Sequence, residues 1–183
     1  MALKPDTKRI IFESFEKLLR THSLEDITVQ QILNDCGASR SAFYRHFKDK
    51  YDLMIWAYRK QLDQIINNLP ELSSYQEVTY ELMAFLKSKR EYFANIAKAE
   101  VQNSFREFMY DYSLRYVLHH LKEALKSDEL PREYILSAQA SCAGITFITL
   151  EWLMRGCDIS VSEFTQILCD SIPIKISPYF SQK

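Results

Sequence analysis

The fold is decided by one stretch of the chain, TVQQILNDCGASRSAFYRHFKDK, which runs from Thr28 to Lys50. Thr28 is a good N-cap, and the apolar residues that follow it recur at the i, i+3, i+4 spacing of an amphipathic helix. Gly37 can adopt positive φ and end that helix, and Ser39 is the N-cap candidate of a second helix over residues 40–47. Two short helices joined by a glycine-containing turn predict a helix-turn-helix.

The second of these helices has two different faces. Phe43 and Phe47 lie one turn apart and are expected to point inward. The opposite face carries hydroxyls, cations and long donors, which suit base edges and phosphate oxygens. We therefore predict a DNA-binding surface made of Thr28, Ser39, Arg40, Ser41, Tyr44, Arg45, His46, Lys48 and Lys50. The alternative is an ordinary solvated charged face.

Within this surface the residue types suggest two roles. Base edges are assigned to Arg40, Ser41 and Arg45, since an arginine can bind guanine in bidentate fashion. Phosphate contacts are assigned to Thr28, Ser39, Tyr44, His46 and Lys50, and Lys48 suits either role. Lys50 falls near the start of the next helix, where a cation is unfavourable unless something anionic binds, and a phosphate would remove that cost. For His46 a half-buried structural role is an equal alternative.

Several of these features also occur together in a known family. They are the Ile27-Thr28-Val29 segment, Ile32, Cys36-Gly37-Ala38-Ser39, the run from Phe43 to Lys50, and Leu53. On these residues the region from Arg9 to Tyr58 resembles the DNA-binding domain of the Tet repressor family of bacterial transcription regulators. The sequence departs from the family pattern at His22, Leu33 and Ser41-Ala42, and the last of these bears on which bases are read. The resemblance implies a sequence-specific transcriptional regulator, most simply a repressor.

Composition and charge agree with a compact helical protein. The 183 residues include three Gly and five Pro, and 47% are apolar. Residues 1–50 carry a net charge of +2 and the remainder −3, so the basic side chains are concentrated where DNA contact is predicted. The four cysteines are scattered and read as reduced thiols. With no signal-peptide pattern or long apolar run, a cytoplasmic protein is expected.

The periodicity of the whole chain predicts an all-α protein of about nine helices. The expected ranges are 7–21, 29–36, 40–47, 49–68, 75–88, 90–97, 102–126, 131–155 and 160–171, followed by a non-helical tail. Residues 1–50 are assigned to a three-helix DNA-binding domain that extends into the fourth helix to about residue 65. Residues 51–183 are assigned to a helical dimerisation and effector domain.

A second, looser resemblance concerns Leu82 to Phe180. Its cues are Phe85-Leu86-Lys87, Asn103-Ser104-Phe105 and the stretch from Gly144 to Gly156 around Trp152. They resemble the branch of the family that includes a regulator of dihydroxyacetone kinase genes. The family resemblance implies a small-molecule pocket in the C-terminal bundle. Candidate lining residues are Tyr92, Phe93, Asn103, Phe108, Tyr112, Tyr116, Gln139 and Trp152, with ordinary core packing as the alternative.

A homodimer is also expected, because one helix-turn-helix offers too little surface for tight specific binding. The helices over 131–155 and 160–171 have more apolar residues than one buried face requires. Candidate interface residues are Ala140, Ala143, Gly144, Phe147, Leu150 and Trp152, and burial of the same residues in the core is the alternative.

Enzymatic chemistry has little support in the sequence. A phosphate-binding glycine loop and a His-Glu-x-x-His motif are both lacking, and the four histidines do not have metal-ligand spacing. We therefore expect no catalysis, no metal and no cofactor. The second functional hypothesis is a helical adaptor or co-regulator that acts mainly through a protein partner.

Overall fold

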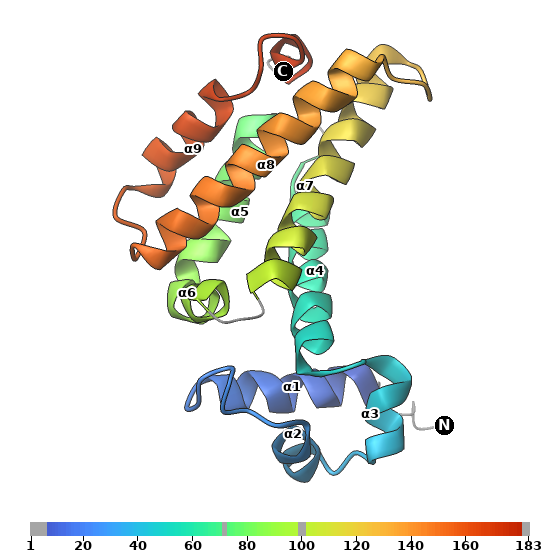
Figure 1. Cartoon of the computed structure of the whole chain (residues 1–183), viewed down its shortest axis with the longest axis vertical. Coiled ribbons are helices and arrows are strands. Elements are labelled where there is room, and N and C mark those ends of the chain that lie inside the picture. Colours follow the sequence, from blue (N-terminus) through green and yellow to red (C-terminus); the bar gives the residue numbers. More distant parts are fainter. Residues whose placement is uncertain (1–6, 71–72, 99–101, 181–183) are drawn as a thin grey trace. The chain divides into compact units, whose positions relative to one another are not determined.

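The computed structural model describes residues 7–70, 73–98 and 102–180. Within these ranges the chain forms nine α-helices, one short 3-10 helix and no strand (Figure 1). The elements are α1 (Thr7–Leu19), α2 (Val29–Cys36), α3 (Arg40–His46), α4 (Lys50–Asn68), α5 (Tyr75–Ser88), α6 (Arg90–Lys98), α7 (Gln102–Leu125), α8 (Arg132–Met154), α9 (Val161–Asp170) and η1 (Ser177–Tyr179). The predicted all-α fold is confirmed.

Capping residues set most helix boundaries at the predicted positions. The Thr28 hydroxyl accepts from the backbone of Gln31, whose side chain accepts from the Thr28 N–H, so the two form a capping box. Gly37 ends α2 with a φ of 68°, a left-handed conformation that costs glycine little. Ser39 then caps α3. These local interactions make two short helices possible where propensity alone would not.

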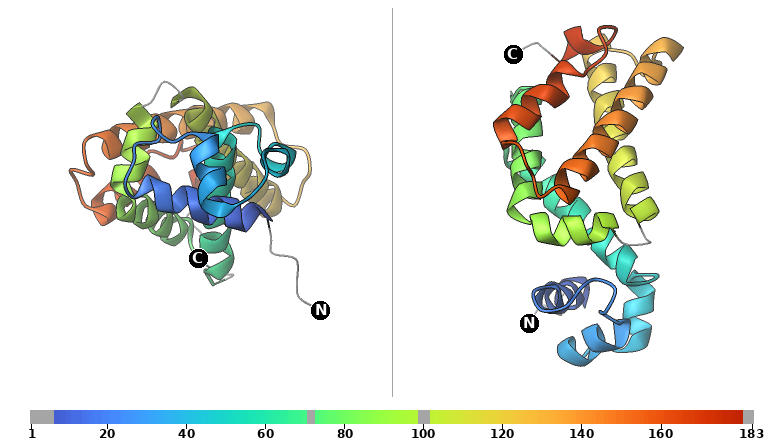
Figure 2. Two further views of the ribbon diagram at one scale, coloured as in Figure 1. Left: turned by 90° about the horizontal axis from the view of Figure 1, so that it is seen from below. Right: turned by 60° about the vertical axis from the view of Figure 1, so that its left-hand side comes forward.

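The chain divides into two compact units, residues 1–63 and 64–183, and the boundary falls within α4. In the first unit α2 crosses α1, and α3 contacts both (Figure 2). Fully buried side chains from each element, among them Ile11, Ile32, Phe43 and Leu53, form its core. The unit thus buries the apolar faces of helices that are too short to be stable alone.

The second unit is built from paired helices. α7 packs along α8, α5 packs along α9, and α6 contacts α7 and α8 (Figure 1). Aromatic stacks fill the spaces between them: the ring centroids of Phe93 and Phe105 are 5.9 Å apart, and those of Trp152 and Phe164 are 4.4 Å apart. Each such pair adds to the stability that burial already provides.

Some helix ends differ from the predicted positions by one or two residues, and the tail differs in kind. Pro131 is the N-cap of α8 and not its first residue. The tail, predicted to be non-helical, contains η1, which places Phe180 in a buried cluster with residues of α7 and α8. His120 fixes this turn, because its Nε2 lies 2.8 Å from the Tyr179 carbonyl oxygen and its ring stacks on Phe180. A contact between residues 59 positions apart in the chain leaves no local sequence signal.

Candidate nucleic-acid interface

The position of α3 is fixed by aromatic side chains on its inner face. Phe43 and Phe47 are both buried, as predicted, and their ring centroids are 5.7 Å apart. Phe47 also meets Trp56 of α4 at 5.6 Å, and Trp56 meets Phe12 of α1 at 6.0 Å. α3 is therefore held by α1 and α4 through edge-on ring contacts.

The outer face of α3 carries the side chains predicted to read bases. Arg40, Ser41 and Arg45 are exposed, and the Tyr44 side chain is 51% exposed although its ring rests edge-on against Phe43. Lys48, just beyond the helix, is exposed as well. The structure thus leaves exposed, on α3 and just beyond it, a group of cations and hydroxyls with the length and chemistry for a DNA groove.

Three of the residues predicted to contact phosphate have additional structural roles. Thr28 donates its hydroxyl hydrogen to the Gln31 side chain at 2.7 Å, within the capping box. Ser39 accepts from the Ala42 N–H at 3.1 Å, which uses an oxygen lone pair and not the hydroxyl hydrogen. His46 is half-buried, and its ring centroid lies 6.3 Å from that of Phe47. This agrees with the half-buried structural role that was the alternative to a phosphate contact.

Lys50 has surroundings that differ from its prediction. Its Nζ donates to the carbonyl oxygens of Leu24, Glu25 and Ile27 at 2.7, 2.9 and 2.7 Å. An ammonium group has three N–H donors, so all three are engaged within the chain. The cost of a cation at the start of α4 is therefore offset by backbone carbonyls and not by a phosphate, which corrects the sequence-based argument for this residue.

Burial lowers the pKa of Lys50, whereas the neighbouring carboxylates of Glu25, Asp26 and Asp49 act in the opposite direction. Asp49 has a further role, because its Oδ1 accepts from the N–H groups of Tyr51 and Asp52 at 2.9 and 2.8 Å and so caps α4. A carboxylate at this position interacts favourably with the positive N-terminal end of the helix dipole, whereas a cation there is repelled by it.

Two polar side-chain contacts between α1 and α2 were not predicted from the sequence. The buried Ser14 hydroxyl donates to the Ile32 carbonyl oxygen at 2.9 Å, and Lys17 forms an ion pair with Asp35. The hydrogen bond from Lys17 lowers the pKa of Asp35. Gln31 of the capping box was missed as well, although the Thr28-x-x-Gln31 spacing is a recognisable signal for it. The α1–α2 contacts have no such signal, because they join residues 18 positions apart.

The residues predicted to line a ligand pocket occupy separate packing groups in the second unit. Phe93 is fully buried against Phe85, Tyr92 and Phe105. Phe108 is paired with Tyr112, Tyr116 with Tyr75, and Trp152 with Phe164, while Gln139 is half-buried. The Asn103 side chain lies outside the described residues. Burial of Phe93, Phe108 and Trp152 favours the core-packing alternative for these three side chains.

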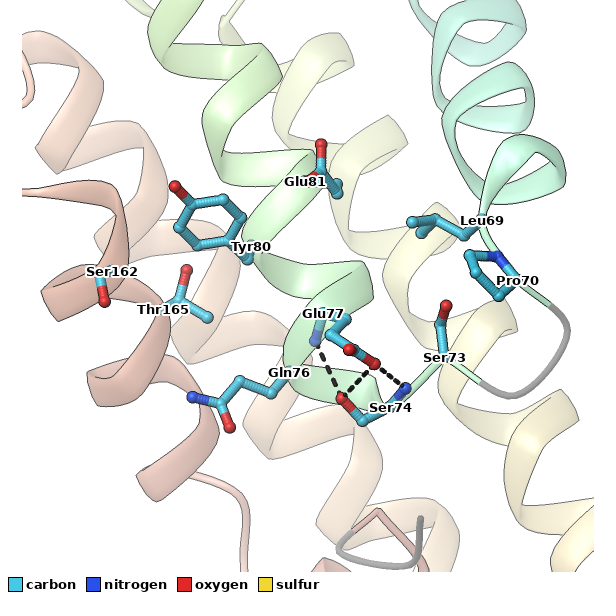
Figure 3. Close-up of a pocket in the computed structure, with 10 residues that line it drawn as sticks. All are labelled: Leu69, Pro70, Ser73, Ser74, Gln76, Glu77, Tyr80, Glu81, Ser162 and Thr165. Carbon is cyan, nitrogen blue, oxygen red and sulfur yellow. Dashed lines mark hydrogen bonds between the residues drawn. The ribbon is translucent and has the colours of Figure 1, made fainter.

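A hollow of about 540 Å³ lies elsewhere in the second unit, beside the end of α4 and between α5 and α9 (Figure 3). It is lined by Leu69, Pro70, Ser73, Ser74, Gln76, Glu77, Tyr80, Glu81, Ser162 and Thr165. The Thr165 hydroxyl is buried and has no hydrogen-bond partner among the described residues. The predicted pocket residues do not line this hollow, which is assembled from residues of the α4–α5 region and residues of α9, two regions distant in sequence.

The candidate dimer residues fall into two groups. Ala140, Ala143, Gly144 and Phe147 are exposed on one face of α8, with Phe147 54% exposed. Leu136, at 53%, and Ile167 of α9 are further exposed apolar side chains. In contrast, Leu150 and Trp152 are only 1% and 3% exposed, so they are core residues of this chain and have no surface to offer to a partner.

Sequence comparison identifies the family. Residues 11–55, which include most of α1 and all of α2 and α3, match the family described as bacterial regulatory proteins, tetR family. Residues 73–173 match the family described as transcriptional regulator C-terminal region. The chain belongs to the TetR family of transcriptional regulators. It is a DNA-binding transcriptional regulator with a helix-turn-helix.

Individual TetR-family relatives are regulators and not enzymes. The chain is 24% identical over 157 residues to the dhaKLM operon transcriptional activator DhaS of Lactococcus lactis subsp. lactis, covering 82% of this chain and 81% of DhaS. It is 30% identical over 78 residues to an HTH-type transcriptional regulator of Staphylococcus aureus strain USA300, covering 43% and 42% of the two chains. The sequence-based recognition of the family is confirmed.

Two solved structures show the same fold. The dihydroxyacetone kinase operon activator DhaS aligns with a TM-score of 0.68 at 20% identity and covers 97% of this chain and 100% of its own. The fatty acid degradation regulator FadR from Bacillus halodurans aligns with a TM-score of 0.58 at 17% identity, covering 91% and 94%. Within the described residues, no helix of this TetR-family chain has the length and apolar content to cross a bilayer.

Proposed function

We propose that this chain binds a near-palindromic operator as a homodimer and represses transcription from the adjoining promoter. The observation that carries the proposal is the exposed face of α3, held in place by buried Phe43 and Phe47. A protein bound over promoter DNA lowers transcription by excluding polymerase. A palindromic site follows from two-fold symmetry, which places the same helix in two successive major grooves.

Within the operator we assign base reading to Arg40, Ser41 and Arg45. Their side chains are exposed on consecutive turns of a helix with seven residues, so all of them fit within one major groove. Phosphate contact is assigned to Tyr44 and Lys48, which lie at the edge of that face, and to the hydroxyl of Ser39. Thr28 and His46 are secondary candidates because both already serve local structure.

Support for the homodimer comes from α8. Leu136, Ala140, Ala143, Gly144 and Phe147 follow i, i+4, i+7, i+8, i+11 spacing, which lies along one helix face. No charged residue occurs from Tyr134 to Leu150. An exposed apolar face of this kind is typical of a protein–protein contact, and small residues at its centre allow two helices to approach closely.

Ligand control is the part of the proposal that concerns the second unit. A ligand must bind the DNA-competent and DNA-incompetent states with different affinities, and α4 is the element that belongs to both compact units. We propose that an effector acts through α4. Exchange of α4 amides that stays unchanged with every compound that releases the operator would contradict this route.

Activation of transcription is the second candidate. It is favoured by the L. lactis relative, whose name describes it as an operon activator and which aligns over 82% of this chain. The position of the operator relative to the promoter decides between repression and activation. The adaptor hypothesis, in which a protein partner replaces DNA as the main target, is a separate outcome of the same experiment.

The test is selection of bound duplexes from a random-sequence pool, followed by footprinting on genomic DNA. We expect discrete sites with two half-sites whose centres are about 10–10.5 base pairs apart, or a multiple of that distance. A site over the promoter supports repression and a site upstream of it supports activation. Binding without any sequence preference contradicts the proposal and favours the adaptor.

A further inference from the structure

We infer that Lys50 is a positioning residue that ties the start of α4 to the segment from Leu24 to Ile27, and thereby sets where the helix-turn-helix begins. The inference rests on the proposed function for its DNA-binding consequence. Its structural part stands by itself in the DNA-free protein. It replaces the phosphate contact expected of Lys50.

The geometry of the ammonium group is the first step. Three carbonyl oxygens converge on one Nζ at 2.7 to 2.9 Å, and together they use every N–H donor that lysine has. Hydrogen bonds to a charged donor are stronger than neutral ones. A phosphate could therefore be bound only by breaking contacts that the folded chain already makes.

The second step is what the three carbonyls belong to. They come from the short segment between α1 and α2, whose side chains Leu24 and Ile27 are buried in the first unit. Ser23 Oγ donates to Asp26 Oδ2 at 2.6 Å across the same segment. The next residue is Thr28, the N-cap of α2, so a shift of this segment moves the first turn of the helix-turn-helix.

The third step is what holds Lys50 itself. It is the first residue of α4, and Asp49 caps that helix directly before it. The Nζ also lies 5.2 Å from the ring centroid of Tyr51. Movement of the start of α4 is thus conveyed to the segment before α2 through one side chain, while the Phe47–Trp56 contact conveys it to the end of α3.

Lys48 provides a matched control. It lies two residues earlier and is exposed, and its charge is the same, but it is placed where a phosphate contact is proposed. A lysine that contacts a phosphate contributes to counterion release, so its removal lowers the slope of log affinity against log salt by about 0.9 per contact. A lysine that only positions the chain does not affect this slope.

The experiment compares Lys50→Met with Lys48→Met in the full-length chain. Amide hydrogen exchange is measured without DNA, and operator and random-duplex affinities are measured over a range of salt. For Lys50→Met we expect exchange over residues 24–29 to increase about tenfold while α1 amides keep their rates. Operator affinity should fall about tenfold more than random-duplex affinity, with the salt slope unchanged. For Lys48→Met we expect the salt slope to fall and the exchange to stay unchanged.

The inference is overturned if Lys50→Met lowers the salt slope by about 0.9 per protomer and leaves exchange over residues 24–29 at the wild-type rate. It is also overturned if neither quantity changes. If Lys50→Met fails to fold, Lys50→Arg is the second variant. It keeps the charge but replaces the compact ammonium group by a planar guanidinium, whose N–H groups cannot all point at the three carbonyl oxygens. Faster exchange with an unchanged salt slope is then expected, and wild-type exchange overturns the inference. If the wild-type chain binds no operator, the proposed function fails while the exchange measurement still decides the role of Lys50.

Discussion

The outer faces of α3 and α8 are both exposed, yet their chemistry is opposite. α3 has seven residues, and its outward side chains include Arg40, Ser41 and Arg45. α8 has 23 residues, and its outward face between Tyr134 and Leu150 is uncharged and carries Phe147. The first face suits a polyanion and the second suits another apolar surface. Exposure alone therefore does not identify an interface; the chemistry of what is exposed does.

The inner faces of α3 and α8 are both buried, and different side chains anchor the two helices. α3 is anchored by buried phenylalanines, and α8 by Ala138, Cys142 and Leu153 within the second unit. Burial raises the pKa of Cys142, as expected for a thiol in an apolar core. Each helix is thus fixed on one side and exposed on the other.

The largest expected effect is on the inner face of α3. Phe43→Ala removes a fully buried ring, and such a change typically costs about 3–5 kcal/mol of unfolding free energy. The neighbouring Tyr44→Ala, at a half-exposed position, is expected to change stability by less than about 0.5 kcal/mol and to weaken DNA binding instead. Denaturant unfolding monitored in the first unit measures the difference, and equal losses for the two variants would contradict the assigned faces.

The outer face of α8 is tested by Phe147→Glu. A charge at an apolar interface anchor should raise the dimer dissociation constant by about thirtyfold or more, corresponding to about 2 kcal/mol. Ile174→Glu, at a side chain 90% exposed in the tail, is the control and should leave the dimer intact. Analytical ultracentrifugation over a concentration series measures both. A wild-type chain that is monomeric at micromolar concentration would contradict the dimer proposal outright.

The outer face of α3 is tested by Arg45→Ala. Loss of a bidentate base contact should cost about 1–3 kcal/mol of discrimination at each half-site, so dimer affinity for an operator with two half-sites should fall roughly thirtyfold or more. Random-duplex affinity should fall much less, because non-specific affinity is the sum of many charge contacts with phosphates and one arginine contributes little to it. Titration of labelled operator and random duplex under one salt condition gives both values. An equal fall for the two duplexes would show that Arg45 does not read bases.

The smallest expected effect concerns the core against which α8 packs. Burial raises the pKa of Tyr75, which lies beside the cluster containing Cys142 and Phe180. The unfolded chain therefore loses this phenolic proton at lower pH than the folded chain. Stability is fully present below the unfolded pKa of about 10 and falls by about 1.4 kcal/mol per pH unit above it.

Tyr75→Phe should remove this part of the alkaline destabilisation. The measurement is the free energy of unfolding at pH 9 and pH 11. Burial also raises the pKa of Tyr116, so Tyr116→Phe is the companion variant. An unchanged pH dependence in Tyr75→Phe would place the alkaline effect elsewhere.

The first unit was more predictable than the second, for a physical reason. Thr28, Gly37 and Ser39 act on backbone groups within a few residues of themselves, so their roles as caps are visible in the sequence. The spacing of Phe43 and Phe47 likewise determines which side of α3 is buried. In the second unit, apolar residues occupy both faces of α8, and periodicity could not separate core from interface. Leu150 and Trp152 belong to the core, whereas Ala140 and Phe147 are on the surface.

The helices, their caps, the helix-turn-helix and the family could be read from the amino-acid sequence, because each depends on residues close together in the chain. The role of Lys50, the fixing of η1 by His120 and the hollow between α5 and α9 became visible only in the folded chain. Each of these joins segments that are far apart in sequence, and the direction of a side chain across such a distance is set by packing. Lys50 and Lys48 are alike in type and nearly adjacent in the chain, yet one points into a carbonyl cluster and the other into solvent.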